Sequence, residues 1–267
     1  MNEPQPFDLS AYLERIGFQG ELEPTLATLR SVHRAHLAAI PFENIDVRLG
    51  RPIGLDLHSL QAKLVAGLRG GYCFEQNTLF AAALDALGFE VATLEARVRP
   101  PGATATLPRT HMVLRAIVNG QAWLADVGFG GDGPLDPVLL DGSLCETLDG
   151  SYRIDREHES TLVLRRSWRG SCRDLYAFSE TPALPVDFEM ANYFTSTHPQ
   201  SRFVRTLTVQ RSRPEQRQIL RGRIYTVRRG TREVEREISP SELPALLAQE
   251  FGLSISPEDS VRALGEG

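Results

Sequence analysis

The chain of 267 residues is 42% hydrophobic and 24% charged, which is typical of a globular protein long enough to bury a large core. Its formal net charge is −5 and its arginines are spread along the sequence, so we expect no nucleic-acid partner. The sequence has no run of about 18 apolar residues and no secretory signal pattern, which predicts a cytoplasmic protein that does not enter a membrane.

The N-terminal third of the chain is expected to be helical. Asp8 or Ser10 can cap the first helix, Pro24 fits the first turn of the second, and Gly88 closes the last. The expected helices cover residues 8–17, 24–40, 60–70 and 73–88.

From Val91 the hydrophobic pattern changes to a period of two, which predicts strands as far as about Phe178. The clearest signal is a hairpin in which residues 111–118 and 121–127 flank a two-residue type I′ turn, Asn119-Gly120. The elements expected after these are strands at 161–166, 204–210 and 219–228 and short helices at 241–251 and 257–264.

The register of the hairpin brings a histidine and an aspartate together. With a two-residue loop, Val113 faces Asp126 and His111 faces Gly128, so His111 and Asp126 are diagonal neighbours on one face. Their Cα atoms are then about 7–8 Å apart, a distance that an imidazole and a carboxylate can bridge. The opposite face is more apolar and is expected to pack on the core, which leaves the pair free to meet a third group. An ordinary polar cross-strand contact is the alternative.

Cys73 is the candidate third group. It is expected to begin a helix, where the helix dipole and unpaired N–H groups stabilise a thiolate. Cysteine, histidine and aspartate would then be the nucleophile, base and orienting group of a cysteine-dependent acyltransferase or hydrolase. A buried structural thiol is the alternative, and we retain that interpretation for Cys145 and Cys172, because the three widely spaced cysteines match no disulfide framework or zinc pattern.

Two further histidines, His33 and His36, are three residues apart on an expected helix. No carboxylate or cysteine completes a ligand set around them, so we expect surface or capping roles and no metal site.

Four blocks of the sequence resemble arylamine N-acetyltransferases of the compact bacterial type. They are RGGYCFEQN at 69–77, HLAAIPFEN at 36–44, TH at 110–111 with DVGFGG at 126–131, and NYFTSTHP at 192–199. The likeness extends over about residues 5–210. It implies an α+β fold related to papain-like proteases and transglutaminases, with a helical bundle (1–89), a β-barrel (90–184) and a C-terminal α/β lid (185–267).

The resemblance also implies roles for particular residues. Cys73 becomes the acetylated nucleophile, His111 its base and Asp126 the group that orients His111. Glu43 and Arg69 form a structural ion pair near the site. The residues expected to contact the acceptor are Phe42, Phe129 and Phe203, and those expected to contact the donor are Thr110, Gly130 and Gly131.

The implied reaction is acetyl transfer from acetyl-CoA to an aromatic amine or hydrazine by a ping-pong mechanism. No metal is expected, and the protein would be a monomer or a homodimer. An amide synthase, an amidase or a transglutaminase-like enzyme that uses the same three residues is the alternative. A binding module that has lost activity is less expected, because all three residues are present.

Overall fold

The computed structural model describes residues 7–102, 106–147 and 150–265, and the first part of the chain is helical, as the sequence predicts. The helices in this part are α1 (Leu9–Ile16), α2 (Leu26–Ala39), α3 (Ile45–Arg48), α4 (Leu57–Leu60), the π-helix η1 (Gln61–Ala66) and α5 (Cys73–Ala86). Asp8 caps α1, since its Oδ1 accepts a hydrogen bond from the Ala11 N–H at 2.9 Å. Gly17 ends this helix with a left-handed backbone.

Two predicted helix boundaries are wrong. Pro24 lies outside α2, because Thr25 is the N-cap and its hydroxyl accepts a hydrogen bond from the Thr28 N–H at 3.2 Å. The helix that precedes α5 ends before Gly67, since Leu68 has a left-handed backbone and the chain then pairs with another segment. In that pairing the Glu43 N–H donates to the carbonyl of residue 71 at 3.0 Å.

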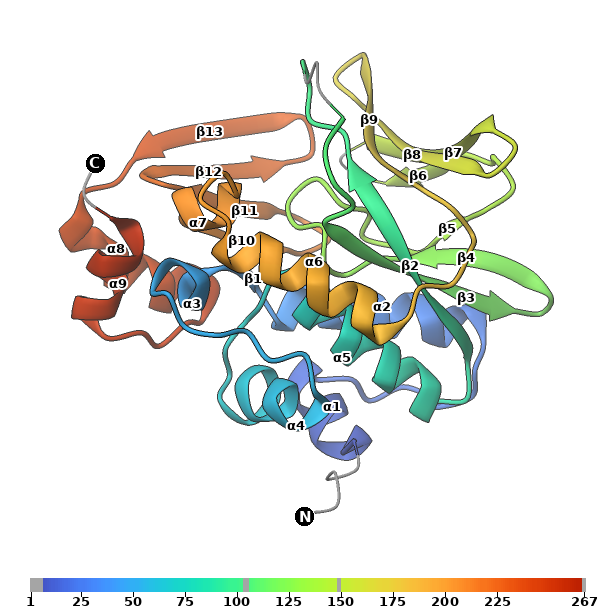
Figure 1. The fold of residues 1–267 in the computed structure, drawn as a ribbon, viewed down its shortest axis with the longest axis horizontal. Coiled ribbons are helices and arrows are strands. Elements are labelled where there is room, and N and C mark those ends of the chain that lie inside the picture. The colour runs from blue at the N-terminus through green and yellow to red at the C-terminus, as the bar shows by residue number, and fades with distance from the viewer. Residues whose placement is uncertain (1–6, 103–105, 148–149, 266–267) are drawn as a thin grey trace.

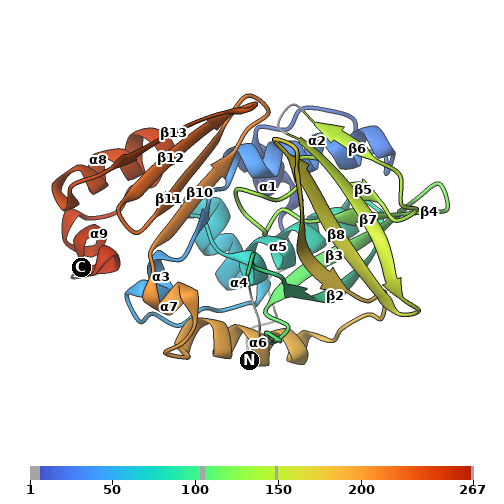
Figure 2. The same cartoon turned by 90° about the horizontal axis from the view of Figure 1, so that it is seen from above.

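The middle of the chain forms one antiparallel sheet of eight strands in the order β5-β4-β3-β2-β9-β8-β7-β6. Its strands are β2 (Glu90–Val98), β3 (His111–Val118), β4 (Gln121–Ala125), β5 (Val138–Leu139), β6 (Cys145–Thr147), β7 (Gly150–His158), β8 (Thr161–Trp168) and β9 (Ser171–Phe178). The sheet curves round toward a closed barrel (Figures 1 and 2). The predicted hairpin is confirmed, because β3 and β4 pair Val118 with Gln121 and Leu114 with Ala125.

A second antiparallel sheet of five strands has the order β1-β10-β11-β12-β13. Its strands are β1 (Phe42–Glu43), β10 (Thr208–Ser212), β11 (Arg217–Arg221), β12 (Ile224–Arg229) and β13 (Arg232–Glu237). Because β1 belongs to the N-terminal part of the chain, this sheet joins the two ends of the sequence (Figure 1). The predicted strand at 219–228 is two strands, since Gly222 has a left-handed backbone and a turn forms there.

The remaining helices lie after the large sheet in the sequence. They are α6 (Pro185–Thr197), α7 (Arg202–Arg205), the 3-10 helix η2 (Pro240–Glu242), α8 (Leu243–Leu246), the π-helix η3 (Leu247–Phe251) and α9 (Pro257–Leu264). The first two residues of the strand predicted at 204–210 therefore belong to α7, and the strand itself begins at Thr208. No helix in the part of the chain that the structure describes is long and apolar enough to cross a membrane.

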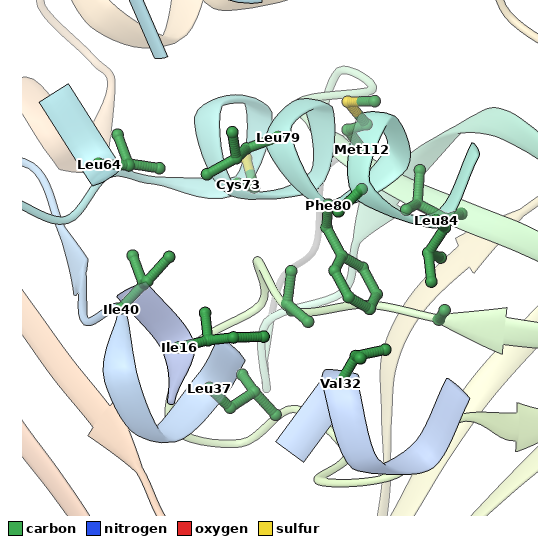
Figure 3. Close-up of a cluster of buried hydrophobic side chains, with 14 of the residues drawn as sticks. Ile16, Val32, Leu37, Ile40, Leu64, Cys73, Leu79, Phe80, Leu84 and Met112 are labelled. Carbon is green, nitrogen blue, oxygen red and sulfur yellow. The ribbon is translucent and has the colours of Figure 1, made fainter. Parts of the chain in front are cut away.

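Buried side chains form three clusters. The first lies between the N-terminal helices and β3 and includes Met112, and in it Val32 of α2 lies beside the ring of Phe80 of α5 (Figure 3). The second lies on the other face of β3 and includes Val113, so both faces of this strand are buried. The third combines Ile45 with the C-terminal sheet and helices. This cluster joins segments from both ends of the chain. The predicted division into three domains, with boundaries at residues 89 and 184, stays a prediction.

Candidate active site

Cys73 is the first residue of α5 and is buried. The helix begins here because Tyr72 is its N-cap, and the Tyr72 N–H donates a hydrogen bond to the Glu75 carboxylate at 3.0 Å. Gly71 leaves room for that carboxylate, since a Cβ at Gly71 would lie 2.7 Å from the Glu75 Oε2. The Cys73 thiol is therefore held at the positive end of the helix dipole.

A cluster of ion pairs supports this end of α5. The Lys63 ammonium lies 2.7 Å from Glu75 and 2.8 Å from Asp46, and their charges raise its pKa although burial opposes this. The expected ion pair is present, with the Arg69 Nη2 2.6 Å from the Glu43 Oε1. Lys63 is the only lysine in the chain, so lysine is not available to bind a ligand in the cavity.

His111 and Asp126 meet as the hairpin register predicts. The His111 Nε2 lies 2.8 Å from the Asp126 Oδ2, which also accepts a hydrogen bond from the Tyr176 hydroxyl at 2.8 Å. The Asp126 Oδ1 accepts hydrogen bonds from the Asn77 side chain at 3.0 Å and from the Gly128 N–H at 2.9 Å. Four donors therefore hold this buried carboxylate in one orientation.

The charges of the site reinforce one another. Burial would lower the pKa of His111, but the charge and hydrogen bond of Asp126, together with those of Cys73, raise it to about 10. Burial would raise the pKa of Asp126, but His111, Asn77 and Tyr176 lower it. Since Asp126 occupies Nε2, Nδ1 is the ring nitrogen of His111 that is left to interact with Cys73. An imidazolium in this position favours negative charge on the neighbouring sulfur.

The segment after Asp126 packs directly on the start of α5. A Cβ at Gly128 would lie 2.7 Å from the Cys73 Cα and 2.7 Å from the Asn77 Nδ2, so a side chain does not fit there. Asn77 in turn accepts a hydrogen bond from the Val127 N–H at 3.1 Å. These contacts fix the distance between the cysteine and the His–Asp pair.

Cys73 and His111 line a cavity of about 550 Å³. Phe42, Phe129 and Phe203, the residues expected to contact the acceptor, also line it. The Phe42 and Phe203 ring centroids are 5.7 Å apart, and the Phe129 ring lies edge-on to His111 at 5.3 Å. The cavity therefore has an aromatic wall beside the thiol.

Two of the three residues expected to contact the donor line the cavity, and the third, Gly130, does not. Thr110 and Gly131 line the cavity, and the Thr110 carbonyl oxygen lies 3.6 Å from the Cys73 Sγ, where it can accept the thiol proton. Gly130 has a left-handed backbone, and a Cβ there would lie 2.0 Å from the Gln210 Oε1. Gly130 thus makes room for a side chain of β10. Among the described residues, no group of three histidine, cysteine or acidic side chains could hold a metal.

Comparison with known proteins identifies the family. A family profile described as N-acetyltransferase matches residues 25–261. The chain is 40% identical to the arylamine N-acetyltransferase of Mycolicibacterium smegmatis over 255 residues, which are 93% of this chain and 92% of that protein. The chain belongs to the arylamine N-acetyltransferase family. It is accordingly an enzyme of the transferase class, and the resemblance seen in the sequence is confirmed.

Solved structures of arylamine N-acetyltransferases share the fold. The Salmonella typhimurium enzyme superposes with a TM-score of 0.91 at 34% identity, covering 96% of this chain and 97% of that one. The Mycobacterium marinum enzyme, solved in complex with CoA, gives a TM-score of 0.91 at 34% identity, covering 96% and 98%. The predicted mixed fold with a barrel-like sheet is confirmed.

In this family member, sequence reasoning missed several groups behind the site, and His33 is the clearest. It was expected at the surface but is fully buried. Its Nε2 accepts a hydrogen bond from the Asp126 N–H at 3.2 Å, so its Nδ1 carries the proton that is donated to the Leu135 carbonyl at 2.9 Å. Burial lowers the pKa of His33, which remains neutral and ties both ends of the segment 126–135 to α2.

His36 is buried as well, which also contradicts the expected surface role. Its two ring nitrogens lie 2.8 Å from the Tyr12 hydroxyl and 2.6 Å from the Gln76 Oε1. Burial lowers its pKa to about 3. The Gln76 amide also donates to the Pro41 carbonyl at 2.9 Å, so this network joins α1, α2, α5 and the start of β1.

Proposed function

We propose that the chain transfers an acetyl group from acetyl-CoA to the nitrogen of arylamines or arylhydrazines, through an acetyl-Cys73 intermediate. The observation that carries the proposal is the line from Cys73 through His111 to Asp126 at the wall of an aromatic cavity. Membership of the arylamine N-acetyltransferase family supports both the donor and the acceptor class.

In the first half-reaction, His111 takes the proton of the Cys73 thiol, and Sγ attacks the thioester carbonyl of acetyl-CoA. A bond forms between Sγ and the acetyl carbon, the bond from that carbon to the sulfur of CoA breaks, and His111 returns its proton to the departing thiolate. One thioester replaces another, so this step is nearly balanced. Asp126 stabilises the imidazolium that forms.

In the second half-reaction, the neutral amine attacks the carbonyl carbon of acetyl-Cys73. A C–N bond forms, the C–S bond breaks, and His111 carries the proton from nitrogen to the Cys73 sulfur. General acid–base catalysis of this kind typically increases the rate by about 10²–10⁴-fold. The aromatic wall formed by Phe42, Phe129 and Phe203 holds the ring of the acceptor.

The test is intact-protein and peptide mass spectrometry after mixing with acetyl-CoA in the absence of amine. One acetyl group on Cys73 is expected, and it should disappear when an arylamine is added. Double-reciprocal plots should be parallel, because CoA leaves before the amine reacts. Cys172→Ser is the matched control, since this cysteine is exposed and does not line the cavity.

Two other outcomes would contradict the proposal. Intersecting kinetic lines without an acetylated enzyme would indicate direct transfer in a ternary complex. An acyl-enzyme that discharges to water or to aliphatic amines, but not to arylamines, would instead support the amidase or amide synthase alternative.

A further inference from the structure

Two arginines of the cavity wall are without an ionic partner. Arg202, at the start of α7, and Arg221, at the end of β11, both line the cavity that contains Cys73. Neither side chain makes a hydrogen bond or ion pair with any residue that the structure describes. The other two arginines of the wall have ionic partners, because Arg99 lies 2.6 Å from Glu157 and Arg173 lies 2.7 Å from Asp132.

The unpaired arginines are close enough to influence each other and the thiol. Burial lowers the pKa of Arg202, and the charge of Arg221 lowers it further. The charges of Cys73 and Asp132 act on Arg202 in the opposite direction. Two positive charges beside one cavity repel each other, and a bound anion would offset that repulsion.

Arg202 places its positive charge next to the aromatic wall of the cavity. Its guanidinium carbon lies 5.1 Å from the centroid of the Phe203 ring, which itself lies 5.7 Å from that of Phe42. The guanidinium lies over the face of Phe203, so an aromatic ring bound against these two phenylalanines would lie beside it. A ring substituent is therefore within reach of a charged donor.

We propose that Arg202 and Arg221 form an anion subsite for the acceptor, so that the enzyme favours arylamines that carry a carboxylate. This inference rests on the proposed function. A planar guanidinium binds a carboxylate through paired, charge-assisted hydrogen bonds, which are stronger than neutral ones and depend on direction.

The phosphates of CoA are the other source of negative charge. They are separated from the reacting sulfur of CoA by the whole pantetheine arm. Arg202, in contrast, shares the cavity with Cys73 and feels its charge. The substituent of an amine that is attacking acetyl-Cys73 is only one ring away from the thiol, so the acceptor is the better match.

The experiment compares 4-aminobenzoate with its neutral isostere 4-aminobenzamide. For each enzyme, the ratio of the two kcat/KM values measures the preference for the carboxylate. Arg202→Ala and Arg221→Ala are each expected to reduce this ratio by about 10-fold to 100-fold, the value of a hydrogen bond to a charged group. Arg202→Lys should restore part of it. Arg205→Ala is the matched control, because Arg205 belongs to the same helix but does not line the cavity, and it should keep the wild-type ratio.

A second donor separates the two sources of the anion. 4-Nitrophenyl acetate delivers an acetyl group without any phosphate, and the reduced preference should persist with it. A defect that is equal for both acceptors and disappears with this donor would assign the arginines to CoA and overturn the inference. An unchanged ratio in both alanine variants would also overturn it. If the wild-type enzyme acetylates neither amine, the proposed function itself is wrong.

Discussion

Replacing the Asp126 carboxylate by an amide is the sharpest test of how the site is organised. Asp126→Asn keeps the size of the side chain but exchanges one hydrogen-bond acceptor for a donor. All four groups around the carboxylate donate to it in the present structure. The variant therefore has to place an NH₂ group where two donors already point.

The structure indicates which side the new NH₂ takes. On the Oδ1 side, the Gly128 N–H cannot accept, and turning the Asn77 amide would break its bonds to the Met112 carbonyl and the Val127 N–H. The amide oxygen therefore stays there, and the NH₂ faces His111 and Tyr176. The tyrosine hydroxyl can rotate to accept, but the His111 Nε2 has to lose its proton. Neutral His111 then carries hydrogen on Nδ1, which faces Cys73, and it can no longer act as a base.

The expected loss of turnover is about 10⁴-fold, as is typical when such an orienting group is removed. Stability should change much less, because the loss of one or two charge-assisted contacts costs about 1–3 kcal/mol. That energy lowers the melting temperature of a chain of this size by about 2–12 °C. Rapid-quench mass spectrometry measures acetylation of Cys73, and circular dichroism follows unfolding.

The control is Asp136→Asn, which removes a carboxylate that pairs with the half-exposed Arg34 and does not line the cavity. It should keep wild-type turnover, since exposed ion pairs contribute about 0–1 kcal/mol. A folded Asp126→Asn protein that acetylates Cys73 at more than about a tenth of the wild-type rate would refute the tautomer argument.

Three further predictions address the thiol, the packing and the charge cluster. Iodoacetamide at about pH 6 should label Cys73 before Cys145, because His111 stabilises negative charge on Cys73 whereas burial raises the pKa of Cys145. Peptide mapping that finds both cysteines labelled at equal rates would contradict this. Gly128→Ala should slow acetylation of Cys73 and destabilise the fold by about 1–3 kcal/mol, because the added methyl group overlaps the start of α5. Single-turnover kinetics measure the rate of acetylation and thermal melts measure the stability. Wild-type values in both would contradict the packing argument. Asp132→Asn should lower the melting temperature, since three arginines lie 2.7–2.8 Å from this carboxylate. Because these arginines hold the pKa of Asp132 well below its ordinary value, the difference from wild type should be present above about pH 4 and shrink as pH falls further; a difference that is independent of pH would contradict this.

The His–Asp pair could be predicted because its determinants are local. A two-residue turn fixes the register of its strands, and the left-handed backbones of Asn119 and Gly120 are those that the type I′ turn requires. The register in turn brings His111 beside Asp126. The position of Cys73 at a helix start was also predictable, from the glycines before it and the apolar period after it.

The groups that support this pair could not be predicted in the same way. Tyr176 and Asn77 are 50 and 49 positions away from Asp126 in the sequence, and only the packing of β9 and α5 brings them to it. His33 was expected in a surface or capping role, because no carboxylate or cysteine near it in the sequence completes a metal-ligand set. Burial is tolerated here because both of its ring nitrogens find partners on the segment after β4.

The C-terminal part of the chain was hard to predict from the sequence for a different reason. Residues beyond Phe203 offered little that was diagnostic, yet the family profile extends to residue 261. Short strands, a turn at Gly222 and π-helical segments give weak periodic signals. Their assembly depends on β1, which pairs with β10 from more than half the chain away.

Glycines of the segment 126–131 have packing roles in the structure. The resemblance assigns Gly130 and Gly131 to the acetyl donor, which stays a prediction, and two of the segment's glycines have a packing reason. Gly128 lets the backbone meet Cys73, and Gly130 makes room for Gln210 of β10. This segment therefore connects α5 to the C-terminal sheet and forms part of the cavity wall. Phe129 is a side chain of this segment that lines the cavity, whereas the proposed preference for anionic acceptors depends on Arg202 and Arg221, which line the cavity from outside the segment.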